Sequence, residues 1–256
     1  MAKLEHRQHF GIPVFATKLP ANKHRRKELI DFFFELRGDR GDRVHRSNQG
    51  GWHSEENLYQ LDNEHTQWLA KRIVQIAAQG IKEVAKTDVK VQMVAMWANI
   101  NEAGDWNAPH HHLPADWSGV FWARTEIEKR REGDKKVRDG DLLLFDPLPM
   151  ARRFRRASTI SFQPKDGTLL LFPAYLMHMV APHMSDESRI SVSFNLRVAY
   201  ADEDKIKKKD AEAQKERQSH PLLMGKKKVG KKKTGKKKVG KKKTGRKKAA
   251  IRQTRH

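Results

Sequence analysis

The sequence has no cysteine and no long apolar segment. Without cysteine among its 256 residues, the chain can form no disulfide, thiolate metal site or cysteine nucleophile. No run approaches the roughly 18 apolar residues that a membrane-spanning helix requires, and the first residues lack the apolar core of a signal peptide. We therefore expect a cytoplasmic protein with no membrane contact.

The positive charge is unevenly distributed. Residues 205–256 hold 23 of the 53 Lys and Arg residues but only three of the 31 Asp and Glu residues, which leaves residues 1–204 with a net charge of +2 out of +22. The basic character therefore belongs to the C-terminal segment and not to the rest of the chain.

The C-terminal segment divides into two parts. Residues 205–224 are charged and are expected to form a helical linker. Residues 225–256 contain a KKKxG repeat with too little apolar surface to fold, so we expect a disordered tail. Such a tail can bind nucleic acid or another polyanion by neutralising its phosphates, although it can also be a low-complexity appendage that aids solubility.

Residues 1–204 are expected to form one domain in which two helices precede a series of short strands. Apolar residues at helical spacing predict helices over about 22–37 and 63–86, with a long loop between them at 38–57. Short strands separated by Gly, Pro and Asp follow, at 89–100, 117–123, 141–145, 159–164, 167–174, 178–183 and 189–200, after a first strand at 10–19. This order is typical of a β-sandwich or barrel with flanking helices.

The segment NAPHHHLPADWSGVFW, residues 107–122, contains three consecutive histidines. On a strand, His110 and His112 would project to the same side while His111 points away. A third ligand has to come from elsewhere, and His178 is the best candidate because it directly follows an apolar strand. Three imidazoles suit iron, zinc, copper or nickel.

A second pattern begins at Arg189. In RISVSFN the side chains of Arg189, Ser191 and Ser193 share one face of a strand, and apolar side chains occupy the other. An inward-facing arginine is costly to bury without a partner, and the rest of this strand has no Asp or Glu. This favours an external carboxylate as its partner, with an acid on another strand as the alternative.

Together these patterns resemble the Fe(II)/2-oxoglutarate-dependent dioxygenases, and in particular a 2-oxoglutarate/Fe(II) oxygenase family of bacteria and phages with an H-x-H, distal His and R-x-S arrangement. The resemblance covers about residues 8–200. It rests on the segments SNQGGWHS, WANIN, GDWNAPHHHLPADWSGVFW, LLLFDP, GTLLLFPAYLMHMVAPH and RISVSFN.

The resemblance implies a double-stranded β-helix (jelly-roll, cupin-like) fold with Fe(II) and 2-oxoglutarate as cofactors. It places iron ligands at His110, His112 and His178. Arg189 would hold the distal carboxylate of 2-oxoglutarate with help from Ser191, and Asn99 would contact cosubstrate or substrate. The reaction implied is hydroxylation of an unidentified substrate, either a small molecule or a group attached to a polymer.

The histidine at position 112 departs from the wider superfamily, which carries Asp or Glu there. Asp116 or Asp146 could instead supply an oxygen ligand, or the centre could be a three-histidine iron site that does not use 2-oxoglutarate. A third alternative is a nucleic-acid-binding protein whose jelly-roll is catalytically silent.

Overall fold

The computed structural model describes residues 11–19, 23–40, 44–125, 139–148 and 158–203, together with Lys208, Lys209, Ala211, Glu212, Gln214 and Lys215. The chain separates into two units, residues 1–207 and 208–256. The six described residues of the second unit are helical. The predicted tail at 225–256 lies outside the described residues, so its disorder stays a prediction.

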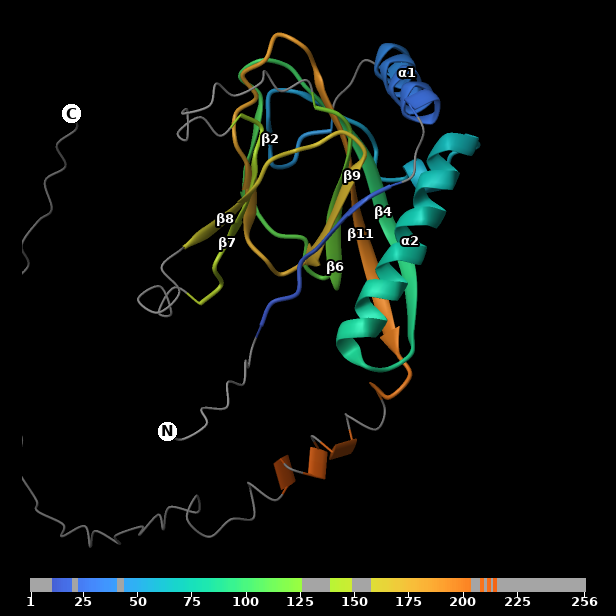
Figure 1. The fold of residues 1–256 in the computed structure, drawn as a ribbon, viewed down its shortest axis with the longest axis vertical. Helices are drawn as coiled ribbons and strands as arrows, with labels where there is room; N and C mark the ends of the chain where they lie inside the picture. Colours follow the sequence, from blue (N-terminus) through green and yellow to red (C-terminus); the bar gives the residue numbers. More distant parts are fainter. Residues whose placement is uncertain are drawn as a thin grey trace, which may run out of the picture. The chain divides into compact units, whose positions relative to one another are not determined.

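The first unit contains the following elements: β1 Phe15–Lys18, α1 Lys23–Arg40, β2 Asn48–Gln49, β3 Trp52–His53, the 3-10 helix η1 Leu58–Gln60, α2 Glu64–Ala85, β4 Val89–Asn101, β5 Trp106–His110, β6 Trp117–Arg124, β7 Leu142–Phe145, β8 Thr159–Phe162, β9 Thr168–Pro173, β10 His178–Val180 and β11 Arg189–Tyr200. The strands form two antiparallel sheets. One has the order β1-β9-β6-β11-β4-β3 and the other the order β2-β5-β10-β7-β8 (Figure 1).

Both helices pack on the outer face of the six-stranded sheet. A cluster of buried residues joins Leu29 and Phe33 of α1 and Ile73 of α2 to Met96 of β4 and Phe194 of β11. Figure 1 shows α2 running along β4 and β11, with β7 and β8 on the opposite side of this unit. The helices therefore close one face of the sheet and leave its inner face to the second sheet.

The inner faces of the two sheets meet in a second apolar cluster. It brings Val120 and Trp122 of β6 and Leu170 of β9 against Leu142 and Leu144 of β7. Phe121, between the two β6 residues, packs in the helix-side cluster instead. Val120 and Trp122 therefore face one side of β6 and Phe121 faces the other. The fold is the predicted jelly-roll, mainly β with flanking helices.

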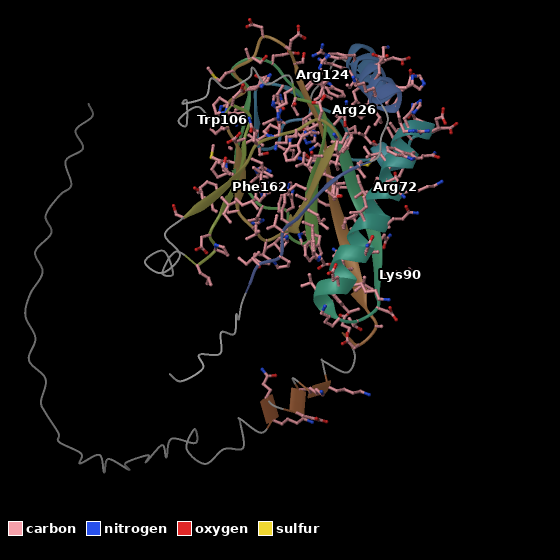
Figure 2. The ribbon with its side chains drawn as sticks, viewed as in Figure 1. Arg26, Arg72, Lys90, Trp106, Arg124 and Phe162 are labelled. Atoms are coloured by element: carbon pink, nitrogen blue, oxygen red, sulfur yellow. The ribbon has the colours of Figure 1, made fainter. Side chains whose placement is uncertain are left out.

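Helix α1 is tied to the six-stranded sheet by charged side chains. Arg26 forms an ion pair with Asp166 at 2.8 Å, and Asp166 also accepts hydrogen bonds from the amide and hydroxyl of Thr125. The Arg124 guanidinium lies over the ring of Phe34. Figure 2 shows Arg26 and Arg124 close to this junction. These contacts anchor α1 across the end of β6.

The predicted loop at 38–57 is the main error in the expected order of elements. α1 continues to Arg40, and two short strands follow: β2 pairs with β5, and β3 pairs with β4. Strands of two residues carry no periodicity that a sequence pattern could reveal. They form because β4 and β5 present edges that accept further pairing.

Helix α2 confirms the second predicted helix. Asn63 caps its first turn by accepting hydrogen bonds from the amides of His65 and Thr66, both at 3.1 Å. Gly80 lies within it, where a side chain would come within 3.3 Å of the Phe15 ring. No helix in the described ranges combines the length and apolar character needed to cross a bilayer.

Candidate metal centre

Strand pairing brings together two histidines that are far apart in the sequence. β5 and β10 are antiparallel neighbours in the five-stranded sheet, and His110 lies directly opposite His178. Their ring centroids are 4.3 Å apart. The pairing of these two short strands therefore brings together two of the three histidines of the cluster.

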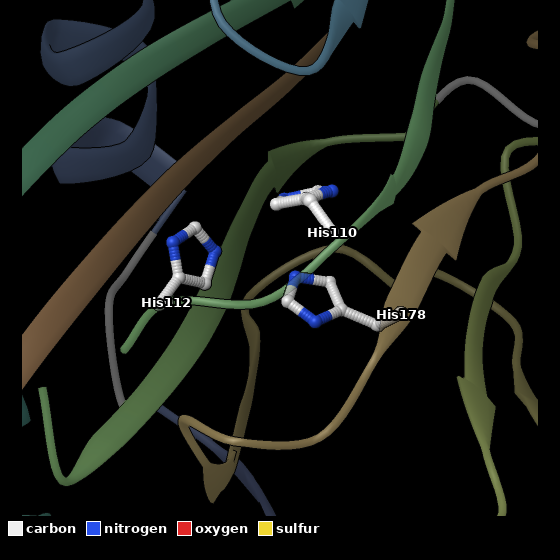
Figure 3. Close-up of side chains that lie close together, drawn as sticks. All are labelled: His110, His112 and His178. Carbon is white, nitrogen blue, oxygen red and sulfur yellow. The ribbon is translucent and has the colours of Figure 1, made fainter. Parts of the chain in front are cut away.

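His112 completes the cluster from a position just beyond the end of β5. Its amide donates a hydrogen bond to the Ala174 carbonyl at 2.9 Å, and its ring centroid lies 4.9 Å from that of His110 and 5.0 Å from that of His178. One ring nitrogen from each histidine lies within 4.8 Å of the others. Figure 3 shows the three rings converging on one space.

The intervening His111 is exposed, as the alternation argument predicts. Alternation along a strand explains only part of this arrangement, because β5 ends at His110. Beyond the strand, the position of His112 is fixed by its backbone contact with Ala174. The pairing of His110 with His112 therefore depends on a backbone contact outside the strand.

Two of the histidines are held in the tautomer that leaves Nε2 as the nitrogen able to bind a metal. The Nδ1 atom of His110 lies 2.6 Å from the Ala108 carbonyl, and that of His178 lies 2.8 Å from the Leu176 carbonyl. Because a carbonyl only accepts, each Nδ1 carries the proton and each Nε2 keeps a lone pair. The donor set therefore fits a divalent transition metal.

Burial keeps the rings neutral. It lowers the pKa of both His112 and His178 to about 3, with the nearby His110 adding to the effect, and it also lowers the pKa of His110. Protonated imidazole cannot bind a metal. At neutral pH all three nitrogens are available as ligands.

The two alternative acids have other partners. Asp116 accepts a hydrogen bond from the Val198 amide at 2.8 Å, and Asp146 accepts one from the Leu148 amide at 2.9 Å. Among the residues that the structure describes, the histidine cluster is the one group that could hold a metal, and it contains no carboxylate. Asp116 and Asp146 are not brought into it.

Arg189 lies across the same pocket from the histidines. It is 2% exposed, and its terminal nitrogen donates to the Asn101 side chain at 3.3 Å. Its Nε has no hydrogen-bond partner, and no carboxylate of the described residues lies within ion-pairing distance of its guanidinium. Burial lowers its pKa to about 10, so it stays charged at pH 7.

The acids nearest to Arg189 come from the segment before β7. Asp139 and Asp141 are both buried and oppose the lowering of the Arg189 pKa. Asp139 lies 3.2 Å from His183 and also accepts from the Met184 amide. Their negative charges partly offset the effect of burial on the Arg189 pKa, and Arg189 lines the pocket.

The other predicted residues share this face of the sheet. β4 and β11 pair so that Asn99 lies opposite Ser191 and Trp97 opposite Ser193. Asn99 donates to the Ser193 hydroxyl at 3.2 Å. Asn101, which holds Arg189, was not predicted, although alternation along WANIN puts it on the same face as Asn99.

One pocket of about 290 Å³ contains both groups of residues. Its polar and aromatic lining residues include Arg46, Ser47, His53, Glu56, Trp97, Asn99, Asn107, His110, His111, His112, His178, Arg189, Ser191 and Ser193. The histidine cluster and the buried arginine therefore face a single space, large enough for a small dicarboxylate and part of a further molecule.

Comparison with known proteins is consistent with this site. Residues 95–195 match the family model described as "Putative 2OG-Fe(II) oxygenase", and that range includes all six predicted site residues. A search of curated protein sequences finds no match.

Several solved structures share the fold. A prolyl-4-hydroxylase from Pseudomonas putida is 12% identical, with 73% of this chain and 92% of that chain covered and a TM-score of 0.51. The α-ketoglutarate-dependent epimerase SnoN from nogalamycin biosynthesis is 15% identical, with 74% and 80% covered and a TM-score of 0.55. HygX from Streptomyces hygroscopicus, crystallised with nickel and 2-oxoglutarate, is 9% identical, with 73% and 83% covered and a TM-score of 0.51. At these identities the likeness concerns the fold alone.

Proposed function

From the premise that the chain is a 2OG-Fe(II) oxygenase, as its match over residues 95–195 and its fold together indicate, we propose that it hydroxylates an unidentified substrate. The observation that carries the proposal is the pocket itself. Three neutral histidines face a buried arginine that has no carboxylate partner among the described residues.

The histidines are the proposed iron ligands. The Nε2 atoms of His110 and His178 are kept unprotonated by the backbone carbonyls that bind Nδ1, and His112 adds the third nitrogen. Iron bound there, together with 2-oxoglutarate and O2, supplies the oxidation of a C–H bond with succinate and CO2 as coproducts. The chain supplies the placement of ligands, cosubstrate and substrate.

Arg189 is the proposed anchor for the distal carboxylate of 2-oxoglutarate. A guanidinium binds a carboxylate through two parallel hydrogen bonds, and Asn101 already holds this one in place. Ser191 lies on the same face of β11 and lines the same pocket, so its hydroxyl can donate to the same carboxylate. Asn99 is proposed to contact the cosubstrate or substrate from β4.

The first test compares two arginines of the same strand. We expect Fe(II)-dependent formation of succinate from 2-oxoglutarate in the wild-type chain and its loss in Arg189→Ala and in His178→Ala. Arg197→Ala is the matched control, because Arg197 is exposed on β11, and we expect it to retain turnover.

Binding of 2-oxoglutarate to the metal-loaded protein by calorimetry separates the roles. Arg189→Ala removes the buried positive charge that pairs with the distal carboxylate, and is expected to weaken 2-oxoglutarate binding by about 2–5 kcal/mol. An iron-loaded protein that neither binds nor consumes 2-oxoglutarate would contradict the proposal and favour a three-histidine dioxygenase without this cosubstrate.

The polybasic segment is proposed to bring the enzyme to polyanions. Residues 205–256 carry a net charge of +20, and glycine at every fifth position of the repeat keeps a chain flexible. Lysines at this density attract phosphate polymers without sequence preference. The substrate could then be attached to such a polymer.

A further inference from the structure

The three histidine rings of the cluster are not held in the same way. In His110 and His178, Nδ1 bonds to the carbonyl of the residue two positions earlier. The imidazole of His112 makes no such bond, nor any other hydrogen bond with the residues that the structure describes. Its backbone is fixed by Ala174, but another contact has to set the angle of its ring.

Trp97 supplies that contact. Its ring lies 5.5 Å from the His112 ring at an interplanar angle of 56°, within the range of favourable aromatic pairs. Trp97 projects from β4 into the pocket and is 6% exposed. A ring of this size beside His112 restricts rotation of the imidazole away from His110 and His178.

The Trp97 ring is in turn held by His53. The two rings are stacked, with centroids 5.5 Å apart and planes 14° apart. His53 comes from β3, where it pairs with Asn99, and so lies diagonally across from Trp97 on the same face of the sheet. His53 therefore stacks on the Trp97 ring from the neighbouring strand.

His53 itself cannot easily turn. Its Nδ1 lies 2.6 Å from the Ser54 carbonyl. The Ser54 amide donates to the Ala98 carbonyl at 3.0 Å, and the Ala98 amide donates to the Ser54 hydroxyl at 2.9 Å. The series of contacts from His112 through Trp97 to His53 therefore ends on the backbone of β4.

We propose that His53 and Trp97 are positioning residues that orient the His112 imidazole toward the metal, in place of the hydrogen bonds that orient His110 and His178. The inference rests on the proposed iron site. It gives a role to two residues from the segments SNQGGWHS and WANIN that have no place among the ligands or the cosubstrate contacts.

The test measures metal affinity and the environment of the ligands separately from turnover. Co(II) is titrated into the full chain by calorimetry, and the Co(II)-loaded protein is examined by NMR for the paramagnetically shifted ring protons of its histidine ligands. The variants are His53→Ala, His53→Phe, Trp97→Leu and Trp97→Phe. His24→Ala, a substitution of an exposed histidine on α1, is the control for loss of a histidine.

We expect His53→Ala and Trp97→Leu to weaken Co(II) binding about tenfold, the lower end of the effect of removing groups that orient ligands. The shifted signals of one histidine should move or broaden while the other two are retained. His53→Phe preserves a flat ring against Trp97, and Trp97→Phe preserves one against His112. Both should bind Co(II) more tightly than the corresponding Ala and Leu variants.

The outcomes separate this inference from the proposed function. If the wild-type chain binds Co(II) and all four variants keep its affinity and its shifted signals, the positioning role is overturned while the iron site stands. A wild-type chain that binds no Co(II) or Fe(II) would overturn the iron site and this inference with it. If His53→Ala or Trp97→Leu does not fold, His53→Asn or Trp97→Met, which also lack the aromatic ring, takes its place, and wild-type Co(II) affinity and signals in that variant would overturn the proposal.

Discussion

His112 differs in kind from the residue expected at its position in the wider superfamily. An Asp or Glu there would bring a negative charge to the metal, whereas the neutral imidazole of His112, whose pKa burial lowers to about 3, brings none. Three neutral ligands would leave a bound metal more positive than two histidines and a carboxylate would. The consequences can be measured by exchanging this residue alone.

We predict that His112→Asp retains Fe(II) binding and 2-oxoglutarate turnover, while His112→Ala weakens metal binding by more than about 100-fold, the upper end of what loss of a mere supporting group costs. Anaerobic Fe(II) titration and succinate assay measure both quantities. His111→Ala is the neighbouring control, since His111 is exposed and outside the cluster. Equal binding in His112→Ala and the wild type would remove His112 from the ligand set.

The buried histidines also predict how the metal-free protein responds to acid. His112 and His178 have a pKa of about 3 in the folded chain, against an ordinary value of about 6.5 when unfolded. Between these values the unfolded chain binds protons that the folded chain does not, so stability is full above about pH 6.5 and falls as the pH decreases toward 3.

Each of the two histidines contributes up to about 1.4 kcal/mol per pH unit to this loss. Urea unfolding of the metal-free protein at pH 7.0, 6.0 and 5.0 measures the slope. The double variant His112→Gln/His178→Gln should show a shallower slope than the wild type. Parallel curves for the two proteins would contradict the assignment of the effect to these rings.

At the scale of the elements, close packing of β6 between its neighbours depends on one glycine. Gly119 lies opposite Leu171 of β9 and Phe194 of β11. A side-chain carbon there would lie 2.3 Å from the Leu170 carbonyl oxygen and 2.3 Å from the Phe194 ring. The carbonyl belongs to the backbone of the adjacent strand, so it cannot move aside without disturbing the sheet.

Gly119→Ala is therefore expected to lower the free energy of unfolding by about 1–3 kcal/mol, as overpacking of a core does. Gly38→Ala is the matched substitution in α1, where no atom lies within 4 Å of the added carbon, and helix propensity should make it stabilising by about 0.5–1 kcal/mol. Urea unfolding of both variants measures the difference. A neutral Gly119→Ala would show that β6 and β9 can separate at little cost.

The elements differ in how far a pattern could predict them. α2, β4 and β11 are long enough for their apolar periods to be read, and the face of β11 that carries Arg189 follows from alternation. β2 and β3 are two residues each and have no period to read. His53 consequently falls within the predicted loop at 38–57, although β3 carries it into the pocket.

At the scale of the whole molecule, the uneven charge predicts two separable activities. Deletion of residues 225–256 should abolish most binding to a fluorescent DNA duplex while leaving succinate formation from 2-oxoglutarate intact. For the full chain, log affinity should fall linearly with log salt, with a slope of about −0.9 for each phosphate neutralised.

Anisotropy titrations over a salt series and the succinate assay measure these two effects. A duplex of different sequence but equal length is the control, and should bind equally because lysine neutralises phosphates without reading bases. Loss of 2-oxoglutarate turnover in the truncated chain would argue against an independent catalytic unit. Undiminished DNA binding would place the basic surface elsewhere.

The sequence by itself determined the kinds of chemistry available: no thiolate, a concentrated positive tail, and histidines and an arginine on faces that alternation assigns. Periodicity is a local property, so it can be read without knowledge of the fold. Only the tertiary structure decided which of these groups meet. His110 faces His178 because β5 pairs with β10. Arg189 donates a hydrogen bond to Asn101 because β11 pairs with β4. The contacts of His112 with Ala174 and Trp97 were beyond any pattern, since they join chain segments whose approach is fixed by packing.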